Sequence, residues 1–189
     1  MVGLAVLFGV GLLGWSLVEY GIHGLLSHRF STPVSPLHWQ HHREPDAVFT
    51  APIAWVPGFL AVYAPLALLI GVASAAAITL GVLVGFVRYE YVHWRIHFRE
   101  PETAGQKRLR EHHLAHHFRN PKAYCGVTTR FWDRVFGTLP ADADADYAAV
   151  ADWPKIEGPS NLRSIWNPRS AVHRFRTARG ARGAPWKSS

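Results

Sequence analysis

Residues 51 to 87 read APIAWVPGFLAVYAPLALLIGVASAAAITLGVLVGFV, a run of 37 residues without Asp, Glu, Lys or Arg. A helix rises about 1.5 Å per residue, so one straight helix of this length would exceed the roughly 30 Å hydrocarbon core of a bilayer. The run therefore predicts a hairpin of two membrane-spanning helices, from Ala54 to Ile70 and from Ala75 to Tyr91. The small residues of GVASAAA, which begins at Gly71, are expected to form the turn. Two buried helices of a soluble domain are the alternative.

A second uncharged stretch, VGLAVLFGVGLLGWSLV, covers residues 2 to 18 and predicts another span. A signal peptide is the alternative, but the stretch has no positive leading region and no small-residue cleavage pattern. Basic residues border these spans on one side, which the positive-inside rule makes the cytoplasmic side. They are Arg29, Arg43, Arg88, Arg95, Arg99, Lys107, Arg108 and Arg110. Three crossings are counted directly, and a further span would make four.

The histidines cluster beside these basic residues. Ten of the twelve form four groups: His23 and His28; His38, His41 and His42; His93 and His97; His113, His116 and His117. Residues three and four apart share a helical face, so three of the groups are each expected to present one imidazole array. The five-residue step in the first group predicts that the helix bends or ends there.

Ten imidazoles gathered near one another indicate metal binding. Without metal, their burial would leave many ring nitrogens unsatisfied and would create repulsion on protonation. Ten ligands exceed the three or four of a mononuclear site, so two ions are expected. Imidazole suits iron, zinc and copper alike. The sequence contains no HExxH motif, which argues against hydrolytic zinc and favours an iron pair that activates O2.

The order HxxxxH, HxxHH, HxxxH, HxxHH, with an apolar hairpin between the second and third motifs, resembles the fatty acid hydroxylase and sterol desaturase superfamily of membrane di-metal oxygenases. The resemblance covers about Leu13 to Leu139 and includes HHREPDAVFTAP and YCGVTTRFWDRVFGTLP. It implies an all-α integral membrane bundle of about three to four transmembrane helices with a cytoplasmic, histidine-rich di-metal cap. It also implies that the ligands are His23, His28, His38, His41, His42, His93, His97, His113, His116 and His117.

The resemblance further implies an oxygenase that uses O2 and external electrons to hydroxylate a lipid C–H bond, above all in a fatty acyl chain. Two iron ions are the expected cofactor, with zinc as an alternative in the isolated protein. A sterol-type desaturase or a carotenoid ring hydroxylase is a further alternative. A non-enzymatic membrane metal-binding or transport protein is a third, but its ligands would be expected near the bilayer midplane rather than beyond the span ends.

Two acidic residues are candidates to support the ligands. Glu19 and Glu90 lie four and three residues before a ligand histidine, so on a helix each could accept an N–H from an imidazole and fix its tautomer. An ion pair of Glu90 with Arg88 or Arg95 is an equal alternative. For Glu19, too, an ion pair is an alternative to the contact with an imidazole.

Three other residues stand near the motifs. His112 is either a supporting group behind the ligands or a solvated residue at the interface, and the second interpretation is favoured. Asp133 is expected to anchor the cap. Cys125 is the sole cysteine, which excludes an internal disulfide and a four-cysteine cluster. With no haem domain or dinucleotide fingerprint visible, electrons are expected from a separate ferredoxin or cytochrome-type donor.

The sequence divides at about residue 140. Residues 1 to 140 form the predicted fatty acid hydroxylase-like domain, and residues 141 to 189 an acidic linker and a basic tail. Asp142, Asp144 and Asp146 in ADADADY are expected in a solvated loop. Residues 160 to 189 hold seven basic residues and no acidic one, in a chain of net charge +7. This tail is expected to be disordered and to lie on anionic lipid headgroups, whereas nucleic acid is not expected.

Overall fold

The computed structural model describes residues 2–30, 32, 35–50 and 52–157. These residues are helical or irregular, without a strand, which confirms the all-α prediction for the described part of the chain. The elements are α1 (Val2–Tyr20), the π-helix η1 (Gly21–Leu26), α2 (Ser35–Arg43), α3 (Pro52–Ile70), α4 (Val72–Phe98), α5 (Ala104–Phe118), α6 (Phe131–Val135) and α7 (Ala143–Val150). The predicted basic tail lies outside the described residues.

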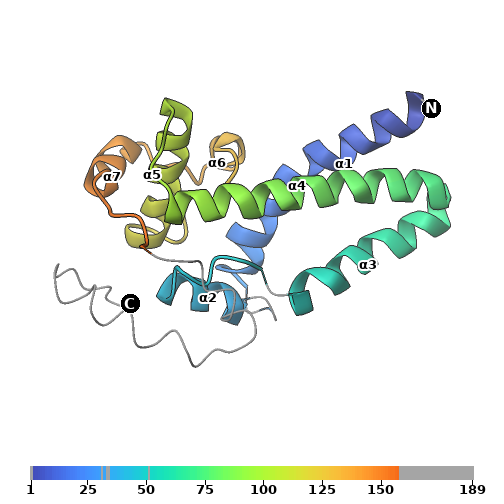
Figure 1. Cartoon of the computed structure of the whole chain (residues 1–189), viewed down its shortest axis with the longest axis horizontal. Helices are drawn as coiled ribbons and strands as arrows, with labels where there is room; N and C mark the ends of the chain where they lie inside the picture. The colour runs from blue at the N-terminus through green and yellow to red at the C-terminus, as the bar shows by residue number, and fades with distance from the viewer. Residues whose placement is uncertain (1, 31, 33–34, 51, 158–189) are drawn as a thin grey trace.

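The predicted hairpin is present, with a shorter turn than expected. α3 and α4 pack against each other, and the chain reverses at Gly71 alone, whose φ of 83° suits a residue without a Cβ (Figure 1). The expectation that GVASAAA forms the turn is wrong beyond its first residue. The alanines that follow have the highest helix propensity and continue α4 instead. α4 also extends past the predicted end at Tyr91, as far as Phe98.

α1 packs along α4 through glycines. A Cβ at Gly81 would collide with the backbone carbonyl of Phe8, and a Cβ at Gly11 with that of Ile78. Such bare backbone lets two apolar helices approach closely, a packing mode that is frequent inside membranes. Trp15 then stacks edge-on against Phe86, with ring centroids 5.4 Å apart. The two helices therefore form a fixed pair.

Two helices have the length and apolar composition to cross a membrane, Gly3–Leu26 and Val72–Phe98. The apolar helix Trp55–Ile70 is shorter. Large apolar side chains on these helices point outward, and Leu13, Leu68 and Leu69 are 75%, 89% and 80% exposed. Exposed apolar surface of this extent suits lipid rather than water. The structure therefore supports a membrane protein.

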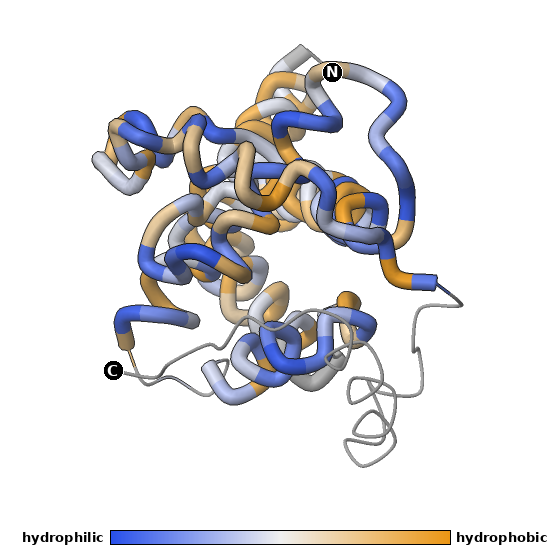
Figure 2. Tube along the Cα trace, turned by 90° about the vertical axis from the view of Figure 1, so that its left-hand side faces the viewer, coloured by the Kyte–Doolittle hydropathy of each residue, from blue (hydrophilic) through white to orange (hydrophobic). Residues whose placement is uncertain are grey.

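The helices α5, α6 and α7 gather at one end of the long helices (Figure 1), and Figure 2 views the chain from this end, with hydrophilic segments in blue. The expected solvated loop at ADADADY is wrong, because residues 143 to 150 form α7. Ala143, Tyr147 and Val150 follow helical spacing and are buried against α5. Asp144 pairs with Arg108 at 3.0 Å. The division of the chain at residue 140 stays a prediction, but α7 packs with the preceding helices.

Candidate metal centre

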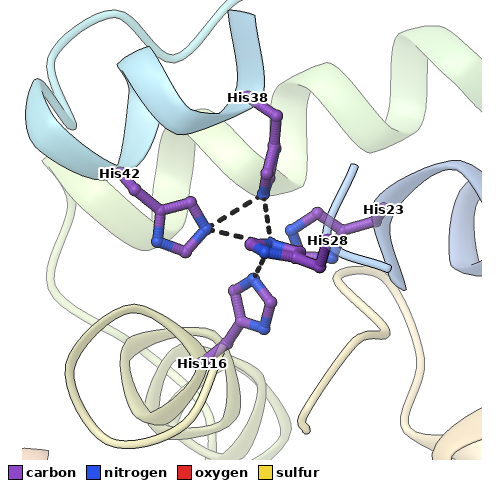
Figure 3. Close-up of side chains that lie close together, drawn as sticks. All are labelled: His23, His28, His38, His42 and His116. Carbon is purple, nitrogen blue, oxygen red and sulfur yellow. Dashed lines mark hydrogen bonds between the residues drawn. The ribbon is translucent and has the colours of Figure 1, made fainter. Parts of the chain in front are cut away.

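The fold brings all ten predicted ligands together in two groups. Group A consists of His23, His28, His38, His42 and His116, and group B of His41, His93, His97, His113 and His117. Within each group the ring nitrogens lie within 4.8 Å of one another. Figure 3 shows the imidazoles of group A converging from η1, the turn that follows it, α2 and α5. Each group is thus a candidate site for one metal ion.

The HxxHH helices contribute to both groups. α2 gives the i, i+4 pair His38 and His42 to group A and His41 to group B. α5 does the reverse, with the pair His113 and His117 in group B and His116 in group A. The expectation of one array per motif is therefore wrong for both HxxHH motifs. Successive helical residues point about 100° apart, so neighbouring histidines reach different groups.

The five-residue step of the first motif is accommodated by a π-helix. The amide of Ser27 donates to the carbonyl of Ile22 at 2.9 Å, an i to i+5 bond. This winding places residues five apart about one turn apart, so His23 and His28 both reach group A. The predicted bend or end of the helix is confirmed, since η1 ends at Leu26.

The ring nitrogens of group A have the spacing that one ion requires. The Nε2 atom of His28 lies 2.7 Å from that of His38, 3.2 Å from that of His42 and 2.9 Å from that of His116. Two nitrogens bound at about 2.1 Å and at a right angle are about 3.0 Å apart. The donor set therefore fits a metal ion.

Group B has the same spacing deeper in the protein. The Nε2 atom of His93 lies 2.9 Å from that of His41 and 3.0 Å from that of His113. The Nε2 atom of His113 in turn lies 3.1 Å from that of His97 and 3.0 Å from that of His117. All five side chains of group B are buried, whereas three of group A are only partly so. Group A is accordingly the more accessible of the two.

The histidines of α2, of α5 and of the turn after η1 are held in the neutral form that metals bind. Burial lowers the pKa of His28 and of His41 to about 3, and it lowers the pKa values of His38, His113 and His117 well below the ordinary value. Neutral imidazole keeps a lone pair for a metal ion at pH 7. The electrostatics of the site therefore match its geometry.

Two ligands are oriented by backbone carbonyls around the start of the YCGVTTRFWDRVFGTLP segment, for which the sequence predicted no contact with the ligands. His23 Nδ1 lies 2.5 Å from the carbonyl oxygen of Cys125, and His116 Nδ1 lies 2.8 Å from that of Ala123. An Nδ1–H donated to a carbonyl leaves the Nε2 lone pair free to face group A. We call residues 123 to 128 the carbonyl loop. Gly24 allows η1 to lie against it, because a Cβ there would come within 2.9 Å of the Cys125 side chain.

Asp133 holds one end of the carbonyl loop. Its carboxylate accepts from the amides of Cys125 and Gly126 at 2.6 and 2.9 Å, and from the hydroxyl of Thr138 at 2.7 Å. The prediction that Asp133 anchors the cap region is confirmed. His112, expected to be solvated, is instead fully buried beside Asp133. That expectation is wrong, because the ring also has Tyr147 as a buried partner, at 2.8 Å from its hydroxyl.

Glu19 holds the other end of the loop. It accepts from the amides of Val127 and Thr128 at 2.8 and 2.7 Å, and from the Thr128 hydroxyl at 2.5 Å. It therefore supports the loop rather than His23, contrary to the expected imidazole contact. Backbone partners of this kind leave no mark in a sequence, since every residue has a carbonyl and nearly every one an amide.

Glu90 has a structural role that neither expectation foresaw. Its carboxylate accepts from the hydroxyl of Thr50 at 2.6 Å and from the Thr50 amide at 3.2 Å. Arg95 pairs with Glu102 instead. Within the described residues Glu90 contacts neither a ligand imidazole nor an arginine. It ties α4 to the segment that precedes α3.

Two membrane-length helices, with two groups of five histidines gathered at one end of them, define a class of membrane metalloprotein. The fatty acid hydroxylase family model matches residues 8–138, and the chain belongs to that family.

Relatives of known name agree with this assignment. The chain is 37% identical over 148 residues to dihydroceramide fatty acyl 2-hydroxylase FAH2 of Arabidopsis thaliana, covering 74% of this chain and 62% of that protein. It is 35% identical to fatty acid 2-hydroxylase of Rattus norvegicus, covering 73% of this chain and 41% of that protein. The chain thus spans less than two thirds of the length of these relatives.

A solved structure has the same fold. It is full-length scs7p, in which only the hydroxylase domain is visible, and it matches with a TM-score of 0.66 at 29% sequence identity. The match covers 82% of this chain and 59% of that one.

Proposed function

We propose that this chain is a membrane-bound di-iron oxygenase that uses O2 and external electrons to hydroxylate a fatty acyl chain. One observation carries the proposal: ten histidines form two adjacent groups whose ring nitrogens have the spacing of metal ligands. Curated relatives named fatty acid 2-hydroxylases support the acyl substrate. The same names favour attack at carbon 2, next to the carbonyl carbon.

An iron pair held by these groups would supply the activation of O2 and the attack on an unactivated C–H bond. The residues of the chain hold, orient and shield that pair. The carbonyl loop fixes the tautomers of His23 and His116, so that their Nε2 atoms face group A. The burial of group B excludes water from one side. The partial exposure of group A leaves the other side open to substrate.

The remaining parts of the proposal concern the surroundings of the protein. We place the histidines on the cytoplasmic side of a multi-pass protein, as the basic residues beside the spans indicate. Cys125 is buried and is the only cysteine of the given sequence, so these residues include no cysteine pair for electron transfer. Electrons would come from a separate ferredoxin or cytochrome-type donor. The basic tail would rest on anionic headgroups.

The test is mass spectrometry of total lipids from a host that expresses the chain together with a reductase and electron donor. The control is His116→Ala, checked for equal expression. Acyl chains that gain one oxygen at carbon 2, only with the unchanged chain, would support the proposal. Products that lose two hydrogens would make the protein a desaturase instead. Identical lipids from both strains, with metal bound and the donor reduced, would contradict enzymatic oxidation.

A further inference from the structure

A cavity of about 420 Å³ opens beside group A, between the end of η1 and α2. His28 lines it, and the Nε2 atom of this histidine is the one that approaches three other ligands of the group. Trp39 lines it as well and packs edge-on against His28, with ring centroids 4.9 Å apart. A molecule in this cavity would therefore lie against the more accessible metal group.

The hydroxyl groups of the cavity wall already donate hydrogen bonds to backbone carbonyls. Ser27 donates to the carbonyl of Ile22 at 2.8 Å, and Thr32 donates to the carbonyl of Leu26 at 2.8 Å. The single hydroxyl proton of Ser35 is shared between the carbonyls of Phe30 and Leu26, which lie 2.8 and 2.9 Å from its oxygen. Toward a bound molecule these hydroxyls offer lone pairs only. They are poor partners for a carboxylate or phosphate, so donors must come from elsewhere in the wall.

The free donors of the wall are two arginines. Arg29 and Arg43 both line the cavity and are exposed. Within the described residues, neither guanidinium makes an ion pair or hydrogen bond, and the lining contains no acidic side chain. Guanidinium groups are always charged and match the planar geometry of carboxylate and phosphate oxygens. The cavity thus has the chemistry of a site for an anionic group.

We infer that this cavity binds the anionic head of an acyl lipid, a carboxylate or a phosphate, through Arg29 and Arg43. The inference rests on the proposed function and identifies the end of the substrate that this cavity binds. In a fatty acid, carbon 2 is one bond from the carboxylate carbon, so a carboxylate held beside His28 brings carbon 2 to group A. The cavity should therefore bind an acyl molecule with a charged head more tightly than the matching neutral amide.

Binding is tested on the full-length, metal-loaded protein in neutral detergent with three probes of equal chain length: laurate, dodecyl phosphate and lauramide. Arg29→Gln combined with Arg43→Gln should weaken binding of the preferred anion on the order of tenfold and leave lauramide binding unchanged. Lys122→Gln with Arg134→Gln removes the same charge elsewhere and should change neither. Stronger binding of laurate identifies a fatty acid head, and stronger binding of dodecyl phosphate a phosphorylated one.

Two results would overturn the inference: lauramide binding as tightly as both anions, or anion binding unaffected by the arginine changes. Metal content verifies that each variant is folded, and the single variants replace the double one if it fails this check. No turnover is needed, so an inactive protein that still binds anions through these arginines would refute the proposed function and not the anion site.

Discussion

The Nε2 atom of His112 lies 3.1 Å from Oδ2 of Asp133, and both side chains are fully buried. Burial would raise the pKa of Asp133, but the hydrogen bonds from His112, Thr138 and the Gly126 amide outweigh it and lower that pKa. The carboxylate therefore stays charged and holds the amides of Cys125 and Gly126. The carbonyl loop, which contains these two amides, orients two ligands of group A, so this pair supports the metal centre from outside it.

Replacing His112 by Ala should weaken metal binding in group A. The change leaves Asp133 buried with one partner fewer and loosens the carbonyl loop, and loss of such supporting partners costs about 10- to 100-fold in metal affinity. Group B should keep its ion. Elemental analysis during titration with a chelator measures this difference. Asp152→Asn, on the exposed surface, is the control. Equal loss from both groups would point to general unfolding instead.

His113→Ala and His116→Ala should each remove a different ion. The two residues are three apart on α5, yet they belong to group B and group A respectively. We expect roughly one ion per chain in each variant, against two in the unchanged protein, with distinct Mössbauer spectra for the iron that remains. If either change released both ions, the ten histidines would form a single interdependent site.

Gly81→Ala should destabilise the pairing of α1 with α4. The new Cβ collides with the Phe8 carbonyl, and overpacking of this kind costs about 1–3 kcal/mol. Gly14→Ala is the matched control on α1, because nothing lies within 4 Å of a Cβ there. Thermal unfolding in detergent compares the two variants. Equal midpoints would contradict the close approach of the two helices.

The contribution of Asp146 to the free energy of unfolding should be present at neutral pH and lost at strongly acidic pH. Burial would raise its pKa, but hydrogen bonds from Tyr124 at 2.6 Å and Arg119 at 2.8 Å lower it below 3.8. A group with a depressed folded-state pKa stabilises above its unfolded-state pKa, and this contribution is lost as pH falls through the folded-state pKa. Asp146→Asn should therefore cost about 1–2 kcal/mol at pH 7 and progressively less below pH 3.8.

The control for that experiment is Asp144→Asn. The Asp144 side chain is 91% exposed, and its ion pair with Arg108 lies at the surface. Such pairs contribute little to stability, so this variant should match the unchanged protein at every pH. Chemical unfolding followed by circular dichroism between pH 3 and 7 measures both variants. A cost for Asp146→Asn that is constant with pH would show that the lost contact is not ionic.

The sequence was sufficient to find every histidine of the two groups, because metal ligands need particular side chains at helical spacing. It could not divide them between the groups. That division depends on how α2 and α5 pack in the folded protein, where neighbours such as His41 and His42 belong to different groups. The partners of Glu19 were likewise hidden, because they are mainly backbone amides more than a hundred residues away in the chain.

Two predictions were wrong because the residue types on which they rested occur in both loops and helices. Alanine and glycine in GVASAAA are common in turns between apolar helices, but alanine also favours helix, and Gly71 alone made the turn. In ADADADY the aspartates suggested solvation. The buried stripe of Ala143, Tyr147 and Val150 spans only two turns, which is too short to stand out from the charge pattern.

The one-residue turn at Gly71 also determines how far along α4 the first ligand histidine lies from the turn. From Val72 to His93, α4 rises about 32 Å, which is close to the roughly 30 Å of hydrocarbon in a bilayer. The helix has no proline to shorten or kink it. If the turn lies at one face of the membrane, the length of α4 therefore places His93, its first histidine, at the opposite face. At that level the polar head of a lipid joins its acyl chain.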